Sequence, residues 1–323
     1  MNILVIRFSA LGDLVTREPT FRAIKHFFPN ATITFLTSSI GKALYEDSAY
    51  FDEIIVYNGF FDTLKKLKIR KYEIIFNIQC TKLSHYIVLF LNKNILINKS
   101  YSLFQKIFKI KSKTKSLKDM LIKANVNKHE LDIYMKSQVN TTISLPTKTK
   151  KTDKSIKSVA ICTGSSKRWE SKKWGLENYI KLIQKLLKDN IEVNLVGSFL
   201  EKDDAYKIEK RFPNIKNHVD KTTLTILKDT LSNVDIFIGN DSGPTHIAAG
   251  VGTSTLTIFG PTSIKHSPKF DNYKGNHFCV SPSNKIKCHP CYKNTCPTEH
   301  ECMKEINVEN VYSIINKFFK EIK

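Results

Sequence analysis

The sequence has no long apolar run and few cysteines, and each shortage excludes a class of protein. The longest apolar run, 86–91, is six residues long, whereas a helix needs about 20 to cross a bilayer. The first seven residues read as a β-strand interrupted by a charge, without the apolar core of a signal peptide. Seven cysteines in 323 residues are too few and too clumped for a disulfide framework, so we expect reduced thiols in a cytosol.

Acidic residues are scarce relative to basic ones. The chain has 51 Lys and Arg against 30 Asp and Glu, a formal charge of +21. Segment 99–157 holds 15 lysines, no arginine and four acidic residues, so it carries +11 of that surplus. Such a surplus favours a polyanionic partner, namely nucleic acid, an anionic membrane surface or a phosphorylated substrate. A chain that is simply rich in lysine explains it equally well.

The sequence does contain a repeated alternation of strand and helix patterns. Hydrophobic residues make up 41% of the chain, which argues against disorder. Strands alternating with helical stretches of this length indicate βαβ units and parallel sheets. The Lys-rich stretch 98–152 interrupts the alternation, and the polar stretch 147–158 reads as a linker. The pattern predicts strands at 2–7, 31–36, 53–57, 72–77, 158–162, 192–196, 235–238 and 255–259, and helices at 14–28, 176–189, 201–211, 223–232 and 308–319.

We therefore expect an α/β protein with two doubly wound domains, at 1–152 and 153–323. We expect the closing helix of the second domain, 308–319, to pack back on the first domain. Ligands of such sheets bind beyond the carboxyl ends of the strands. After the first strand, Gly12 permits a tight turn and Asp13 places a carboxylate where the next helix begins. Taken alone, Asp13 is better explained as a helix cap.

Three loops of the second domain have ligand-binding character. Segment 239–246 is a polar turn that opens a helix, whose free amides favour a diphosphate. The carboxylate of Asp241 would repel a diphosphate, so its place in this turn is explained only if it binds a hydroxyl or orients a neighbour such as His246. Segment 163–169 combines hydroxyls, two cations and an aromatic, which suits phosphate and sugar. Glu201 can receive a sugar hydroxyl, although an ordinary acid in the first turn of a helix explains it slightly better.

Several of these motifs occur together in a known family. They are Ser9-Ala-Leu-Gly-Asp13 with Pro19, Lys167-Arg-Trp169, and above all Asn240-Asp-Ser-Gly-Pro-Thr-His-Ile-Ala-Ala249 followed by Phe259-Gly-Pro-Thr262. Together they resemble the lipopolysaccharide heptosyltransferases of glycosyltransferase family 9, over nearly the whole chain. The resemblance implies a GT-B architecture, in which two Rossmann-like domains face a central cleft. It places the acceptor on the first domain and the ADP-sugar donor on the second.

The resemblance also implies an activity. This is the inverting, metal-independent transfer of L-glycero-D-manno-heptose from ADP-heptose to the inner core of lipopolysaccharide. Asp13 would be the general base, and Lys167 would neutralise the leaving diphosphate. By the same resemblance the donor would be held by Thr163, Glu201, Asp241, Ser242, Gly243, His246 and Thr262, and the acceptor by Gly12 and Arg17.

The implied partners are an ADP-sugar, a lipid A/Kdo-type core glycolipid and the anionic cytosolic face of the inner membrane. The protein would then be cytoplasmic and peripheral to that membrane, with segment 99–157 meeting the lipid surface. A nucleic-acid-binding protein would instead need arginine-rich, aromatic-interleaved basic stretches. Because segment 99–157 has no arginine, we expect no nucleic-acid partner.

Two further features remain, one that departs from the family pattern and one that does not. Arg17 and Glu18 bring charge to a segment where the family usually has small or apolar residues, which leaves open a relative that transfers another nucleotide-activated sugar. Near the carboxyl end stands a group of four thiols, Cys288, Cys291, Cys296 and Cys302. These thiols suit either a structural zinc or unliganded cysteines, and we expect catalysis to require no cofactor.

Overall fold

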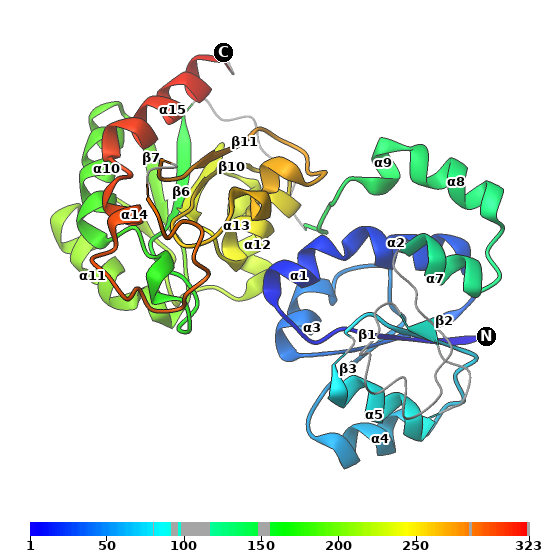
Figure 1. Ribbon diagram of the computed structural model, residues 1–323. Coiled ribbons are helices and arrows are strands. Elements are labelled where there is room, and N and C mark those ends of the chain that lie inside the picture. Colours follow the sequence, from blue (N-terminus) through cyan, green and yellow to red (C-terminus); the bar gives the residue numbers. More distant parts are fainter. Residues whose placement is uncertain (80, 92–95, 98–116, 148–155, 284–285, 322–323) are drawn as a thin grey trace. The chain divides into compact units, whose positions relative to one another are not determined.

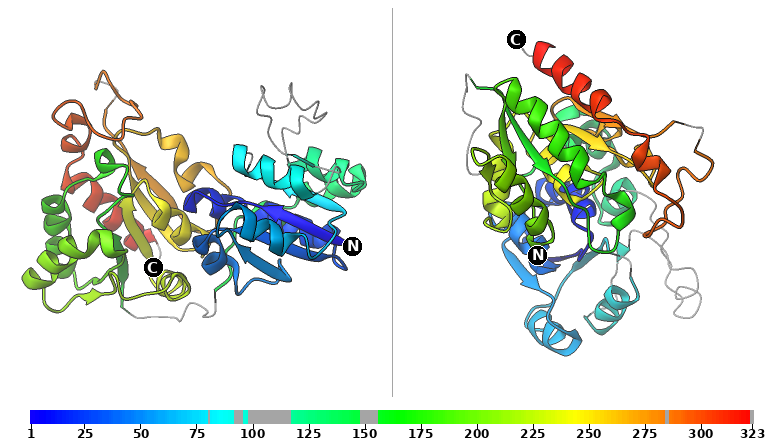
Figure 2. Two further views of the ribbon diagram at one scale, coloured as in Figure 1. Left: turned by 90° about the horizontal axis from the view of Figure 1, so that it is seen from below. Right: turned by 90° about the vertical axis from the view of Figure 1, so that its left-hand side faces the viewer.

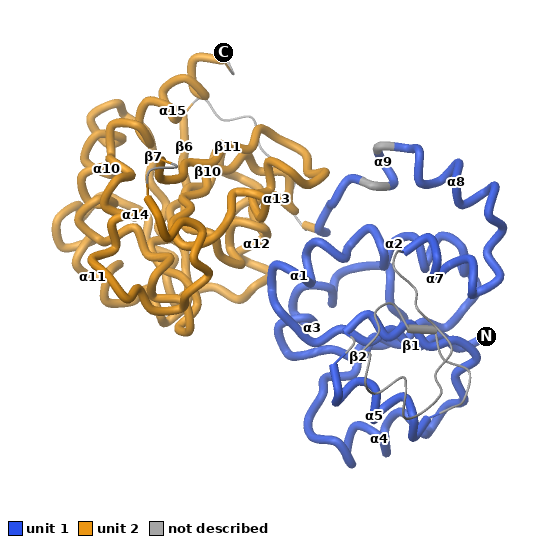
Figure 3. The backbone as a smooth tube through the Cα atoms, in the orientation of Figure 1, with its two compact units in different colours: residues 1–146 blue, residues 147–323 orange. Residues whose placement is uncertain are grey.

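The computed structural model describes residues 1–79, 81–91, 96–97, 117–147, 156–283 and 286–321 (Figure 1). The chain divides into two units, Met1–Pro146 and Thr147–Lys323 (Figure 3). The predicted boundary at 152 and most of the predicted linker lie outside the described residues, as does much of the Lys-rich segment. None of the described helices is long and apolar enough to cross a membrane.

A parallel sheet with the strand order β3-β2-β1-β4-β5 forms the centre of unit 1. Its strands are β1 (Asn2–Ile6), β2 (Thr32–Thr37), β3 (Glu53–Val56), β4 (Ile74–Asn77) and β5 (Leu96–Ile97). Its described helices are α1 (Leu11–Thr16), α2 (Glu18–Phe27), α3 (Ser39–Tyr45), α4 (Phe60–Leu67), α5 (Lys82–Leu91), α7 (Leu117–Lys123), α8 (Lys128–Lys136) and α9 (Gln138–Thr141). In Figure 1, α4 and α5 lie on one side of the sheet and α1, α2 and α7 on the other.

The two faces of this sheet have separate cores because side chains alternate along a strand. Leu4 and Ile6 face a cluster that includes Leu64 of α4 and Ile87 of α5. On β2, Phe35 lies next to the ring of Phe21 from α2, 5.2 Å between centroids. The single helix predicted at 14–28 is instead two, α1 and α2, which meet at residue 17. Pro19 explains the break, since proline suits the first turn of a helix and cannot continue one.

Unit 2 contains a second parallel sheet with the order β11-β10-β9-β6-β7-β8. Its strands are β6 (Ser158–Cys162), β7 (Glu192–Leu195), β8 (Lys216–Asn217), β9 (Ile236–Asn240), β10 (Ser254–Ile258) and β11 (His277–Val280). Its α-helices are α10 (Leu176–Lys188), α11 (Lys202–Arg211), α12 (Leu224–Ser232), α13 (Gly243–Gly250), α14 (Glu301–Lys304) and α15 (Val308–Glu321). The described part of unit 2 also contains four 3₁₀ helices, namely η1 (Glu170–Lys172), η2 (Phe199–Glu201), η3 (Ile264–His266) and η4 (Pro268–Phe270).

The closing helix α15 belongs to the core of unit 2. Its buried Val311, Ile315 and Phe319 join the same hydrophobic cluster as Ile183 and Leu186 of α10, and Figure 2 shows the two helices side by side. Its apolar face is therefore buried within unit 2, in contrast to the expected packing of this helix on the first domain.

The predicted fold class is confirmed in both units. Each sheet is parallel, and its strand order reverses once, between β1 and β4 in unit 1 and between β6 and β9 in unit 2. Loops diverge beyond the carboxyl ends of the two strands at such a reversal and leave a crevice for ligands. These two points are therefore where a site is expected.

Candidate functional site

In unit 1, the loop after β1 is fastened to the residues that follow β4. The Phe8 and Ser9 amides donate to Oε1 of Gln79, at 2.9 and 3.4 Å. Nη1 of the buried Arg7 donates to the carbonyl of Ile78 at 3.2 Å. The carboxyl ends of the two strands at the reversal are thus joined.

Asp13 lies at this edge, in the first turn of α1, as predicted. Its Oδ2 is 2.8 Å from Nη2 of Arg7 and accepts a hydrogen bond from the Ala10 amide at 3.2 Å. The side chain is nevertheless 57% exposed. The capping interpretation is therefore correct, and the carboxylate remains open to solvent. Gly12 is not at a tight turn, because it lies inside the helix and its φ is not positive.

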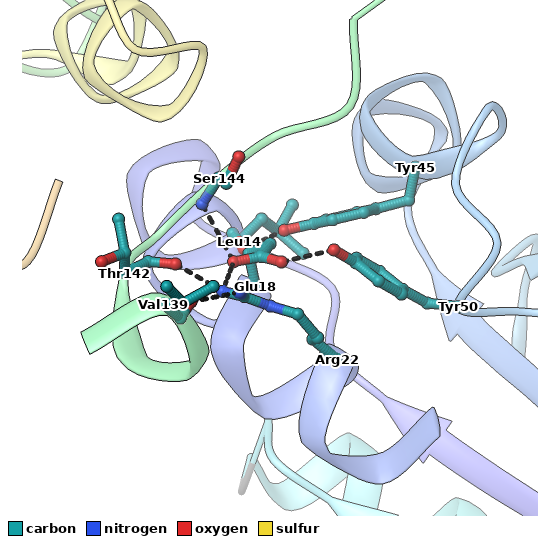
Figure 4. A network of polar contacts seen from close by, with 8 residues as sticks. All are labelled: Leu14, Glu18, Arg22, Tyr45, Tyr50, Val139, Thr142 and Ser144. Atoms are coloured by element: carbon teal, nitrogen blue, oxygen red, sulfur yellow. Dashed lines mark hydrogen bonds and ion pairs between the residues drawn. The ribbon is translucent and has the colours of Figure 1, made fainter. Parts of the chain in front are cut away.

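Glu18, the second charge of the unusual 15–19 segment, is part of a buried polar network (Figure 4). Its side chain has no solvent exposure. The carboxylate accepts hydrogen bonds from Arg22 at 2.8 Å, from the Tyr50 hydroxyl at 2.5 Å and from the Ser144 amide at 3.0 Å. Glu18 is therefore occupied inside unit 1, and its charge gives no support to a relative that transfers another nucleotide-activated sugar.

The network reaches from the start of α2 to the last residues of unit 1. Arg22 also donates to the carbonyls of Val139 and Thr142 (Figure 4). Arg17 takes no part in it. Arg17 is half-buried, and its Nε atom has no hydrogen-bond partner among the described residues. Of the two charges in the segment, Glu18 is thus fully paired inside unit 1, whereas Arg17 lies outside this network.

In unit 2, Asn240 at the end of β9 holds the loop that follows β6. Its Nδ2 donates to the carbonyls of Thr163 and Gly164, both at 2.9 Å. Its Oδ1 accepts from the Trp174 amide at 3.2 Å and the Tyr179 hydroxyl at 3.1 Å. The amide is fully buried and uses both donors and both acceptor positions, so it fixes the two loops against each other. Asn240 belongs to the motif at 240–249, but the local sequence pattern assigned no role to this residue.

The carboxylate of Asp241 is paired with a lysine that the sequence analysis missed. Lys172 Nζ lies 2.7 Å from Oδ2 of Asp241 and donates to its carbonyl at 3.1 Å. The Thr262 hydroxyl donates to the same Oδ2 at 2.7 Å. The lysine ammonium also lies 4.6 Å from the centroid of the Trp169 ring. Asp241 therefore orients neighbouring side chains, as one of the two explanations from the sequence proposed. Its carboxylate holds the side chains of Lys172 and Thr262.

Lys167, the predicted diphosphate-binding cation, is exposed, whereas the Lys172 side chain is only 15% exposed. Two lysines precede a tryptophan by two residues, in Lys167-Arg-Trp169 and Lys172-Lys-Trp174. In the second copy Trp174 is buried, and its Nε1 donates to the carbonyl of Ile306 at 2.7 Å. The repeated Lys-x-Trp spacing could therefore have identified Lys172 as a candidate. Only the fold distinguishes the two lysines, because it buries most of Lys172 and exposes Lys167.

The start of α13 presents free donors, as its sequence predicts. Ser242 is the N-cap, and its Oγ is buried without a partner among the described residues. Gly243 and Pro244 form the first turn, where backbone amides have no partner within the helix. His246, one turn further on, has Nδ1 3.3 Å from the Tyr273 hydroxyl. A helix N-terminus with a spare hydroxyl suits a phosphate.

Glu201 lies against the loop after β6. A Cβ on Gly164 would stand 1.9 Å from Oε1 of Glu201, so only glycine allows this approach. The carboxylate accepts from the Ser198 amide at 2.7 Å and hydroxyl at 2.9 Å. Burial raises the pKa of Glu201 above its usual value despite these hydrogen bonds. Glu201 therefore caps a helix and also borders the loop after β6. In that loop, the Thr163 hydroxyl donates to Asp204 at 3.0 Å.

The cysteine segment 288–302 packs beside these loops. The four thiols line one small cavity of about 30 Å³, together with His300 and Ser171. No three His, Cys, Asp or Glu side chains in the described part of the chain are grouped so that they could hold a metal ion. This arrangement gives the predicted zinc no support, and the thiols form no disulfide with one another. Ser171 also bonds the carbonyls of Asn294 and Lys293, at 3.1 and 2.6 Å, so the segment braces the loop of Lys172.

Comparison with known proteins places this architecture in a family. Lipooligosaccharide heptosyltransferase 2 of Campylobacter jejuni is 27% identical over 98% of this chain and 99% of its own length. The Escherichia coli ADP-heptose LPS heptosyltransferase II structure aligns with a TM-score of 0.76 and 16% identity over the whole of both chains. The E. coli heptosyltransferase WaaC with ADP aligns with a TM-score of 0.70 and 13% identity over 98% of this chain and 100% of the other.

These structural likenesses confirm the predicted GT-B fold class of two Rossmann-like domains. Residues 61–301, about three quarters of the chain, match the sequence pattern of one family as a whole. That stretch contains the unit 2 residues described above except Cys302 and Ile306 and the residues of α15, which lie just beyond it. This chain therefore belongs to glycosyltransferase family 9 (heptosyltransferase).

Proposed function

We propose that this protein transfers L-glycero-D-manno-heptose from ADP-heptose to the inner core of lipopolysaccharide. The observation that carries the proposal is the end-to-end similarity to a lipooligosaccharide heptosyltransferase, 98% of one chain against 99% of the other. The carboxyl edge of the unit 2 sheet supports it. There a mostly buried ammonium group, a spare hydroxyl and a helix N-terminus lie in neighbouring loops, and all three suit the diphosphate of an ADP-sugar.

The donor would bind at this edge of unit 2. Lys172, in place of Lys167, supplies the cation that meets the diphosphate, with Asp241 and Thr262 holding it in position. Ser242 and the amide of Gly243 bind phosphate oxygens, and Thr163 adds a hydroxyl from the loop after β6. Glu201 accepts a ribose hydroxyl, and His246 contacts the diphosphate or the heptose.

The acceptor would bind at the carboxyl edge of the unit 1 sheet, where Asp13 is the general base. The acceptor hydroxyl oxygen forms a bond to the anomeric carbon, and its proton passes to Asp13. The bond from that carbon to the diphosphate breaks, and its electron pair leaves with ADP. Attack from the face opposite the leaving group inverts the configuration, and an oxocarbenium-like transition state gains from the nearby carboxylate.

Arg17 gives this edge a cation for the acidic groups of a lipid A/Kdo-type acceptor, next to the backbone of Gly12. Arg7 serves a different purpose, since it is buried and holds Asp13. A fixed base needs no reorganisation when the acceptor hydroxyl arrives. We propose that this chemistry uses the chain's own residues, with no cofactor.

A panel experiment tests the proposal. The purified protein is incubated with ADP-heptose, other nucleotide sugars and lipid A/Kdo-type acceptors, and nucleotide release and product mass are followed. We expect release of ADP only when ADP-heptose and an acceptor are both present, with one heptose added to the product. Turnover with an acceptor and a different nucleotide sugar, but not with ADP-heptose, would show that the chain is a family 9 transferase of another sugar. No turnover with any pair would contradict the proposal.

A further inference from the structure

One side of unit 1 exposes a cluster of large apolar side chains. Phe61 at the start of α4 is 84% exposed, and Ile69 just after this helix is 81% exposed. On α5, Leu89 and Phe90 follow Tyr86 by three and four residues, and all three are exposed, Phe90 by 57%. Side chains at this spacing share one face of a helix. Water-exposed aromatic residues in such number mark an interaction surface.

The two helices form one surface. α4 and α5 pack together on the same side of the unit 1 sheet (Figures 1 and 2). The ring of Phe60 lies 5.5 Å from the Phe61 ring and 5.6 Å from the Phe90 ring. Phe60 thus links the exposed aromatics of the two helices. We call the exposed residues Phe61, Ile69, Tyr86, Leu89 and Phe90 the α4–α5 face.

The surroundings of the α4–α5 face are basic. Residues 60–91 contain six Lys and Arg and two acidic residues. Both acids are occupied, since Asp62 pairs with Lys66 at 2.8 Å and Glu73 accepts a hydrogen bond from the Asn2 amide. Arg70 pairs with Glu53 of β3 at 2.5 Å, so four of the six cations remain without an ion pair among the described residues. Lys65 and Lys68 follow Phe61 at spacings of four and seven, so they lie along the same stripe of α4 or its continuation. Both lysines are exposed and form no ion pair among the described residues.

We propose that the α4–α5 face docks on the surface of an anionic lipid bilayer. Aromatic and aliphatic side chains beside lysines are the composition of helices that lie in a membrane interface, where the rings enter the headgroup layer and the lysines meet anionic lipid. The charge complementarity favours a bilayer over a second copy of this basic chain, since two such faces would repel each other. The inference rests on the proposed function in one respect, because an acceptor anchored in lipid gives such docking a purpose. It also gives the membrane partner a site other than the Lys-rich segment 99–157.

Vesicle sedimentation with the full-length protein tests the docking. We expect binding to vesicles of phosphatidylcholine with phosphatidylglycerol and little binding to phosphatidylcholine alone. Phe61→Ser with Phe90→Ser should lower the bound fraction about tenfold or more, because two interfacial anchors are lost. Lys65→Gln with Lys68→Gln should also lower it about tenfold at low salt and less at high salt. Both pairs are exposed and leave the core of the fold unchanged.

Matched controls lie on unit 2. Tyr206→Ser with Ile226→Ser removes two side chains that are also at least half exposed, and Lys181→Gln with Lys188→Gln removes two exposed lysines of α10. Neither pair should change vesicle binding. Equal binding of the wild type to neutral and anionic vesicles, or unchanged binding of the Phe61/Phe90 variant, would overturn the proposal. So would self-association without vesicles that this variant abolishes, since the face would then join two copies.

A second readout separates this proposal from the proposed function. The Phe61/Phe90 variant should transfer heptose at the wild-type rate to a deacylated, water-soluble acceptor and more slowly to acceptor embedded in anionic vesicles. A protein that binds vesicles as described but transfers no heptose would leave docking in place and remove the proposed function. Equal losses on both acceptors would assign the effect to the enzyme itself and contradict docking.

Discussion

The two units each place an aspartate after a strand at the point where the strand order reverses, and the two differ in exposure. Asp13 in unit 1 pairs with Arg7 at 2.8 Å and is 57% exposed, whereas Asp241 in unit 2 pairs with Lys172 at 2.7 Å and is 10% exposed. An exposed ion pair contributes about 0–1 kcal/mol to stability. Removing one partner of a buried pair costs about 3–5 kcal/mol. In the proposed mechanism, this difference leaves the Asp13 carboxylate accessible to an acceptor hydroxyl, whereas Asp241 holds the Lys172 ammonium in place.

The sharpest way to break this comparison is to remove the exposed carboxylate. Asp13→Ala should lower the rate of heptose transfer by about 10²–10⁴-fold, the usual contribution of a general base. The free energy of unfolding should fall by about 1–2 kcal/mol, less than for a fully buried pair, because Asp13 is 57% exposed although the buried Arg7 loses its counter-charge. Single-turnover transfer and urea unfolding measure the two effects, and calorimetry with ADP-heptose should show unchanged donor binding.

Asp13→Asn is the matched control for geometry, since its amide oxygen can still accept the hydrogen bond from Ala10. It should lose activity as Asp13→Ala does. Wild-type turnover in either variant would remove Asp13 from the role of base. Loss of donor binding in both would show that this residue acts on unit 2 ligands instead.

Changing the buried cation tests the other half of the comparison. Lys172→Met should lower both ADP-heptose affinity and stability, the latter by about 3 kcal/mol, because Asp241 keeps a buried charge without its partner. The exposed Lys167→Met should be close to the wild type in both. Calorimetry and urea unfolding on the two variants decide which lysine meets the donor, since the sequence analysis favoured Lys167.

A double variant separates stability from binding at the same pair. Lys172→Met with Asp241→Asn removes both charges, so it should recover part of the lost stability without recovering donor affinity. Recovery of donor affinity as well would mean that Lys172 only neutralises Asp241. A loss of affinity in Lys167→Met that equals the loss in Lys172→Met would show that burial does not identify the functional lysine.

Unit 1 also has a buried carboxylate, and it sharpens the comparison within one unit. Glu18→Gln keeps the shape of the side chain but removes the charge that pairs with Arg22. We expect a stability loss of about 2–3 kcal/mol, because the Arg22 guanidinium, held by two backbone carbonyls, loses its counter-charge. Urea unfolding measures it, and donor binding should not change. A Glu18→Gln protein as stable as the wild type would mean that the network in Figure 4 contributes geometry alone.

The sequence predicted the longer central strands and the loops after them because both depend on local patterns, whereas β5, β8 and β11 were not predicted. β6 matches its expected range, and β1 and β7 each end one residue early. Asp13 and the start of α13 lie where strand-following residues should lie. Lys172 and Glu18 could not be assigned in this way, since their roles depend on residues 69 and 126 positions away. Two lysines with the same local spacing to a tryptophan differ only in burial, and burial is set by the fold.

The smallest effect we expect concerns pH and a histidine of unit 2. Burial lowers the pKa of His277 from 6.5 to about 4, so the native state binds a proton less readily than the unfolded state. Stability from the neutral ring is therefore fully present above about pH 6.5 and is lost as the pH falls toward 4, by about 1–2 kcal/mol at pH 5. His277→Asn should remove this part of the slope of unfolding free energy against pH, whereas His129→Asn, at an exposed site of unit 1, should not. If both variants keep the wild-type slope, a group other than His277 causes the loss of stability in acid. Burial of the His277 ring would then contribute less to stability than the contrast between the buried Asp241 and the exposed Asp13 implies.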